Sequence, residues 1–206
     1  MNAEEVVRLC EALLLKEKEG PLMPLRKNMK NDGERRLGLR LTCKLLSANM
    51  VNREAFCVFL RIWRTLECVD VEVINGNIFS FTFKNDRDRQ HVLNGGPWSF
   101  DKALLVLEAP VGKGDIQGMQ FNRVVFWIQI HNIPLLCMTS EIGQFLSGMI
   151  GEVKEIDIGK TGKCVGKYIR VRVVINVDVP LRRILRVDIM QDGKEIVMML
   201  MYERLP

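Results

Sequence analysis

The sequence has no apolar run that approaches the roughly 18 residues of a membrane-spanning helix, so we expect no membrane span and no membrane partner. The residues Met1 to Glu5 are acidic where a secretory signal would be basic, and no apolar stretch with a cleavage site follows. None of the six cysteines falls into a C-x-x-C spacing, which favours free thiols. We therefore expect a reducing compartment, the nucleus or the cytoplasm.

Histidine is scarce, and catalytic motifs are missing. The two histidines, His91 and His131, have no cysteine or serine nearby in a nucleophile spacing. Residues 159–167 are rich in glycine and lysine, but Tyr168 stands where a phosphate loop needs a hydroxyl for Mg²⁺. No H-E-x-x-H motif, paired-cysteine zinc site or EF-hand loop occurs. We expect a protein that is not an enzyme and that has no cofactor or metal of its own.

What remains is the composition of a globular protein with unevenly placed charge. The 206 residues are 48% apolar and 27% charged, which excludes a disordered or collagenous chain. The net charge of +5 is concentrated in two segments. Residues 21–40 hold six bases and two acids, and residues 160–186 hold eight bases and one acid. Such segments favour an anionic partner, although a solvated surface rich in lysine and arginine is the ordinary alternative.

The order of predicted elements indicates an α+β fold. Residues 3–18 have helical periodicity, and residues 20–36 resemble a basic linker. From residue 37, alternation, capping residues and an Asn-Gly turn predict a strand, a helix, a hairpin, a second helix and a strand. Their ranges are 37–45, 52–64, 69–83, 86–93 and 102–107. This β-α-β-β-α-β order is typical of a ferredoxin-like or RRM-like unit.

The second half of the chain repeats this pattern in part. The predicted elements are a strand, a helix, two strands, a short basic turn or helix, and a last strand, over residues 124–130, 139–150, 153–158, 168–177, 180–185 and 196–202. We therefore predict a second, related β-α-β-β-(α)-β unit. The expected domains are 1–36, 37–110 and 119–206. The sequence leaves open whether the two units share one sheet.

Two predicted strands of the second unit place aromatic and basic side chains on one face. Alternation turns every second residue of strands 124–131 and 168–177 away from the core, and we take six of these residues as candidates. These six candidates are Trp127, Gln129, His131, Tyr168, Arg170 and Arg172. As the central strands of a ferredoxin-like sheet they would lie side by side, as a stacking and phosphate-binding platform for single-stranded nucleic acid. The alternative is that Trp127 and Tyr168 pack this sheet against the first unit.

Further basic residues extend the candidate site. Near the platform we include Lys163, Lys167, Arg182 and Arg183 as phosphate contacts. In the first unit, Phe79, Phe81 and Phe83 share the core face, and the aromatic signature of an RNA-recognition strand is absent. The other face of that sheet, with Ile78, Ser80 and Thr82, is expected to be open, so that Arg40 and Lys44 could bind phosphates there.

Four strings in the sequence together resemble a known family. They are Gly95–Asp101 with Leu104–Leu107, Phe126–Pro134, Pro180–Arg183 and Tyr202–Pro206. In this order they resemble a plant domain of unknown function from LINE-type retrotransposon first-ORF (Gag-like) proteins, over about residues 35–206. The resemblance implies a nucleic-acid-binding or assembly module without known catalysis, usually followed by a CCHC zinc knuckle. The knuckle is not in this sequence, so we expect zinc only if one lies downstream, and the family supplies no binding residues to transfer.

The sequence therefore favours a non-enzymatic module that binds RNA or single-stranded DNA. The alternative is a protein–protein or self-assembly module without direct nucleic-acid binding, in which Trp127 and the methionine-rich last strand would be interface anchors.

Overall fold

The computed structural model describes residues 3–12, 20, 22–157 and 167–206, and it divides the chain into two compact units, residues 1–36 and 37–206. The first unit contains helix α1 (Ala3–Ala12), and helix α3 (Lys27–Gly38) begins in it. Residues 13–18 of the predicted first helix lie outside the described residues. The predicted linker over residues 20–36 is wrong from residue 27 on, because α3 begins there. Within α3, Asp32 pairs at helical spacing with Arg35 and Arg36, both at 2.9 Å.

The first sheet has the predicted β-α-β-β-α-β order with one additional strand. Its elements are β1 (Arg40–Leu45), α4 (Arg53–Phe59), the 3₁₀ helix η1 (Leu60–Trp63), β2 (Asp70–Asn75), β3 (Ile78–Thr82), α5 (Asp86–Gly95), β4 (Trp98–Phe100) and β5 (Ala103–Glu108). The strands pair antiparallel in the order β2-β3-β1-β5-β4. The short edge strand β4 was not predicted. It forms because the positive φ angles of Asp101 and Lys102 reverse the chain into β5.

Local signals in the sequence set the helices of the first sheet. The Asn52 side chain caps α4 by accepting from the Ala55 N–H at 3.0 Å, and Asn85 caps α5 by accepting from the Asp88 N–H at 2.8 Å. Both helices bury apolar residues against the same sheet face, where Trp63 lies edge-on to Phe81 at 4.8 Å between ring centroids. The core predicted for this half is therefore present on that face.

The second sheet repeats the strand order of the first. Its elements are β6 (Arg123–His131), the 3₁₀ helix η2 (Leu135–Cys137), α6 (Ser140–Gly148), β7 (Glu152–Ile156), β8 (Tyr168–Asn176), β9 (Ile184–Val187) and β10 (Ile196–Tyr202). They pair as β7-β8-β6-β10-β9, and each strand has its counterpart in the first sheet. The structural duplication is thus confirmed as two separate five-stranded sheets. Residues 177–183 form no helix, and β9 begins at Ile184 instead.

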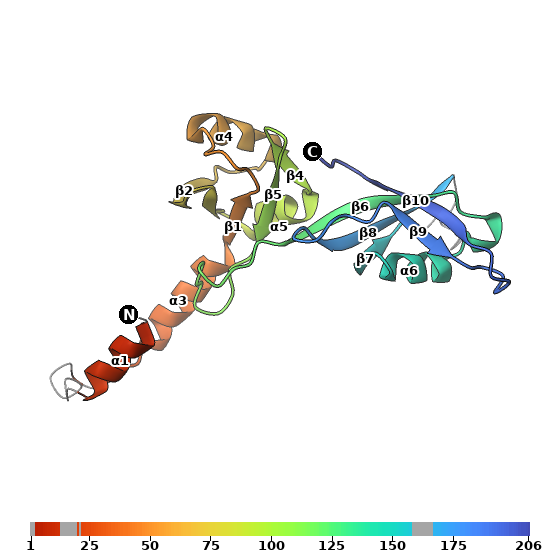
Figure 1. The fold of residues 1–206 in the computed structure, drawn as a ribbon. Helices are drawn as coiled ribbons and strands as arrows, with labels where there is room; N and C mark the ends of the chain where they lie inside the picture. The colour runs from red at the N-terminus through yellow and green to blue at the C-terminus, as the bar shows by residue number, and fades with distance from the viewer. Residues whose placement is uncertain (1–2, 13–19, 21, 158–166) are drawn as a thin grey trace. The chain divides into compact units, whose positions relative to one another are not determined.

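One face of the second sheet is a closed core, and the other is turned away from α6. Apolar residues of β6 and β8, among them Phe126, Ile128 and Val171, are fully buried together with Leu146 of α6. Figure 1 shows α6 lying along this side of the sheet, next to β7 and β8. The opposite face contains Arg172, which donates to the carbonyl of Asn94 in α5. None of the helices in the described residues is long and apolar enough to cross a membrane.

Candidate nucleic-acid interface

The pairing of β6 with β8 brings the six platform residues together. Their register places Trp127 opposite Arg172, Gln129 opposite Arg170 and His131 opposite Tyr168. All six side chains are half-buried and alternate with fully buried core residues. They therefore share the sheet face that points away from α6, where alternation in the sequence predicted them.

Two ring contacts organise this face. His131 and Tyr168 lie with their ring centroids 4.9 Å apart at an interplanar angle of 40°. The guanidinium of Arg170 lies over the Trp127 ring at 3.9 Å from its centroid, and that of Arg172 at 5.9 Å. The 4.9 Å between the His131 and Tyr168 rings is within the range of aromatic pairs, and the 3.9 Å between Arg170 and the Trp127 ring is within the range of cation–π interactions. The indole of Trp127 is thus covered by an arginine rather than bare.

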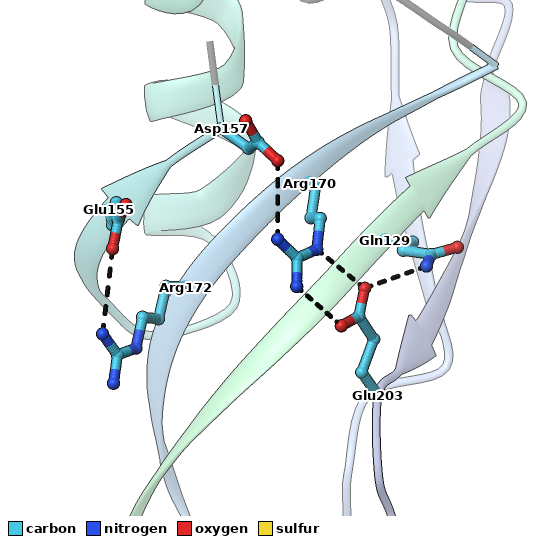
Figure 2. A network of polar contacts seen from close by, with 6 residues as sticks. All are labelled: Gln129, Glu155, Asp157, Arg170, Arg172 and Glu203. Atoms are coloured by element: carbon cyan, nitrogen blue, oxygen red, sulfur yellow. Dashed lines mark hydrogen bonds and ion pairs between the residues drawn. The ribbon is translucent and has the colours of Figure 1, made fainter. Parts of the chain in front are cut away.

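Arg170 is held by carboxylates on both sides. Its Nε and Nη2 donate to the two oxygens of Glu203 at 2.8 and 2.9 Å, and Nη1 donates to Asp157 at 3.4 Å (Figure 2). The parallel pair to Glu203 is the bidentate geometry preferred by arginine and a carboxylate. The hydrogen bonds from Arg170 lower the pKa of Glu203 to about 2, and those same bonds raise the pKa of Arg170. Both groups are charged at neutral pH.

Glu203 also orders the neighbouring polar side chains. Gln129 Nε2 donates to Glu203 at 2.9 Å, and Gln129 Oε1 lies 3.0 Å from His131 Nε2. A carboxylate only accepts, so the amide nitrogen of Gln129 must face it and the amide oxygen must accept from His131. The Nε2 of His131 therefore carries a hydrogen, and the chain of bonds links Glu203 to the stacked His131–Tyr168 pair.

Arg172 is engaged with the first half of the chain. Its guanidinium donates to the carbonyl of Asn94 in α5 and lies 3.7 Å from Glu155 of β7. Its buried Nε has no hydrogen-bond partner among the described residues. Packing against the first half, the alternative considered for the aromatic residues, is thus observed for this arginine. No pattern in the sequence predicted that both platform arginines are paired with carboxylates.

The other basic candidates near the second sheet lie outside its two paired strands β6 and β8. Lys167 is exposed directly before β8, whereas Lys163 lies outside the described residues. Arg182 and Arg183 are exposed in the segment before β9, beyond β10 from the two central strands. Their backbone carbonyls accept from the Tyr202 hydroxyl at 2.9 Å and the Leu200 N–H at 2.8 Å.

The prediction that the second face of the first sheet is open is wrong. Between Arg40 and Lys44 on β1, Thr42 is buried, as is its partner Ser80 on β3. Leu104 and Val106 of β5 bury this same face in one apolar cluster with Phe121, whose N–H donates to Glu108 at 3.1 Å. Arg40 pairs with Glu72 at 3.5 Å. The missed signal was the run Ala103–Leu107, which is apolar on both faces and therefore typical of a strand covered on both sides.

Sequence reasoning also missed three residues that complete the platform. Met199 and Met201 of β10 stand beside His131 and Gln129 and are 55% and 57% exposed. The alternate residues Met198 and Leu200 of the same strand are buried in the core. Glu203 follows β10, and its N–H donates to the Trp127 carbonyl at 2.9 Å. Alternation along residues 196–203 was the signal that could have found all three.

Comparisons with known proteins add one family match. Residues 53–109 match the profile of a domain of unknown function (DUF4283). This is compatible with the predicted resemblance to a domain of unknown function, over a shorter range. No curated protein matches the chain. Among solved structures, the RNA recognition domains 1 and 2 of Sex-lethal from Drosophila melanogaster align over 66% of this chain and 85% of that chain, with 13% identity and a TM-score of 0.29.

Proposed function

We propose that the face of the second sheet built from β6, β8 and β10 binds single-stranded nucleic acid, RNA or DNA, without catalysing a reaction. The observation that carries this proposal is the position of the rings. Trp127, His131 and Tyr168 stand on β6 and β8, on the face opposite α6. RNA-recognition sheets of this topology stack two or three bases on aromatic side chains of their central strands.

The contacts favour stacking over free positive charge as the main source of affinity. Arg170 and Arg172 already face Glu203, Asp157 and Glu155, so they contribute little unpaired charge. An arginine plane over an indole is itself a surface on which a base can stack. Lys167, exposed at the start of β8, supplies a charge near the His131–Tyr168 pair.

We propose a Gag-like retrotransposon origin for the domain on the four strings described above. The match over residues 53–109 supports the resemblance but says nothing of retrotransposons, plants or a zinc knuckle. The sequence of the gene downstream of Pro206 tests this origin. A reading frame that continues into a CCHC knuckle is expected, and a frame that continues into an unrelated domain would contradict it.

Replacement of Tyr168 by leucine tests the binding proposal. The change keeps apolar bulk but removes a stacking surface, which contributes about 1–3 kcal/mol per base. We expect fluorescence anisotropy with a labelled ten-nucleotide strand to show at least a several-fold weaker affinity. The matched control is Phe145→Leu, at an exposed aromatic residue on α6. Equal affinities of Tyr168→Leu and the wild type would contradict the platform.

Self-association is the second candidate function, and the exposed methionines favour it. Met199, Met201 and the neighbouring Ile184 on β9 present apolar side chains at 55%, 57% and 45% exposure. Flexible methionines are common on surfaces that bind other proteins. Size-exclusion chromatography with light scattering separates the two functions. A concentration-dependent oligomer that does not retain nucleic acid would favour assembly.

A further inference from the structure

Three hydrogen-bond donors converge on the carboxylate of Glu203 within the platform. Arg170 Nε and Gln129 Nε2 both donate to Oε1, at 2.8 and 2.9 Å, and Arg170 Nη2 donates to Oε2 at 2.9 Å. A forked arginine with an adjacent amide fits any anion that offers two oxygens side by side. The two non-bridging oxygens of a backbone phosphate are such a pair.

The donors are accessible and stand between the stacking groups. The side chains of Arg170 and Glu203 are 31% and 27% exposed, so solvent reaches the pair. On β6, Gln129 lies between Trp127 and His131, and its partner Arg170 lies over the Trp127 ring. A strand that stacks one base near Trp127 and the next near His131 and Tyr168 would bring the phosphate between them to these donors.

We propose that Glu203 occupies a phosphate-binding seat formed by Arg170 and Gln129, and that a backbone phosphate of the bound strand displaces it. The inference rests on the proposed function and names the contact that such binding makes. The exchange breaks no covalent bond, because one oxyanion replaces another on the same three donors. Glu203 then acts as an internal competitor that weakens binding. Strands bind only when the stacking of their bases offsets the free energy lost on breaking the Glu203 contacts.

Competition of this kind is present throughout the physiological pH range. The pKa of Glu203 is lowered to about 2 by the hydrogen bonds from Arg170, so the carboxylate stays ionised. Asp157, which faces Nη1 of Arg170 at 3.4 Å, remains available to hold the guanidinium when Glu203 leaves. The seat therefore keeps its orientation over the Trp127 ring during the exchange.

The variant Glu203→Gln tests the seat in the full chain. It removes the competing charge and keeps the side-chain shape, so affinity for a ten-nucleotide thymidine strand should rise about fivefold, the worth of one partly exposed ion pair. The matched control is Glu155→Gln, which makes the same charge change beside Arg172 and should alter affinity less than about twofold.

An uncharged strand identifies the group that enters the seat. A methylphosphonate strand of the same sequence keeps the bases but has no backbone charge. Glu203→Gln should bind it no better than the wild type does. An equal gain for both strands, or an equal gain in Glu155→Gln, would overturn the proposal, since the effect would then be one of general charge.

A second measurement uses the wild type, so that the result does not depend on how the variant folds. The Nε–H signal of Arg170 in ¹⁵N-resolved spectra should shift on addition of the thymidine strand and stay unchanged with the methylphosphonate strand. If the wild type binds while the Arg170 signal is unchanged and Glu203→Gln gains no affinity, the proposed phosphate seat is wrong, and the proposed binding of nucleic acid by the platform is retained. If neither the wild type nor Glu203→Gln binds either strand, the proposed function itself is wrong.

Discussion

Arg170 joins Glu203 through two parallel hydrogen bonds, of 2.8 and 2.9 Å, that connect residues 33 positions apart in the chain. The pair exists because β10 lies next to β6 on one side while β8 lies on the other. The carboxylate that follows β10 can therefore reach across β6 to the arginine on β8. This contact links the aromatic side chains of the face to a network of polar side chains.

The stability contributed by Glu203 should depend on pH. Its pKa is lowered to about 2 in the folded state, so the unfolded chain binds a proton more readily. The stabilisation is therefore complete above about pH 5 and is lost as the pH falls toward 2. In urea unfolding, the difference in the free energy of unfolding between the wild type and Glu203→Gln should become smaller as the pH falls over this range. A difference in unfolding free energy that stays constant from pH 7 to pH 3 would contradict the ion pair between Glu203 and Arg170.

A buried carboxylate should hold the loop that follows η1. Asp88 accepts from the Leu66 N–H at 3.0 and 3.1 Å and from the Glu67 N–H at 3.1 Å, and the bond from Leu66 is the main reason that its pKa is lowered. Asp88→Ala leaves these donors without a partner, which should lower the free energy of unfolding by about 1–3 kcal/mol. Thermal or urea denaturation measures the loss.

The same helix offers a control for Asp88. Asp86 lies in the first turn of α5 and is exposed, with an ion pair to Arg89 and a hydrogen bond from Gln90, both at 3.4 Å. Asp86→Ala should change stability by less than about 1 kcal/mol, because an exposed pair contributes little. Equal losses at both positions would show that the helix N-terminus, rather than the loop contact, accounts for the effect.

The segment that covers the first sheet should contribute strongly to stability. Phe121 is 3% exposed in one cluster with Leu104 and Val106. Phe121→Ala should cost about 3–5 kcal/mol of unfolding free energy, as expected for a buried aromatic residue. Phe145→Ala, at a position that is 62% exposed, should cost less than about 0.5 kcal/mol. A small effect at Phe121 would mean that this face is open after all, as the sequence had suggested.

The sequence predicted the elements well where signals are local. The helices capped by Asn52, Asn85 and Thr139 begin within one residue of their predicted starts, and the Asn75–Gly76 turn lies in the predicted hairpin, because each signal depends on a few neighbouring residues. The edge strands β4 and β9 were missed, since short strands form by pairing with a longer neighbour rather than by their own propensity. The helix α3 was missed because its polar residues bury nothing, and it is marked only by charge spacing.

By itself the sequence determined which side chains share a face. A strand alternates with a period of two, so Trp127, Arg170 and their neighbours had to point to the same side once β6 and β8 paired. Only the tertiary structure decided what those side chains meet there. Glu203 and Asp157 reach Arg170, and Phe121 covers the first sheet, through contacts between distant segments. Periodicity in one strand carries no information about which distant residue the fold brings to it.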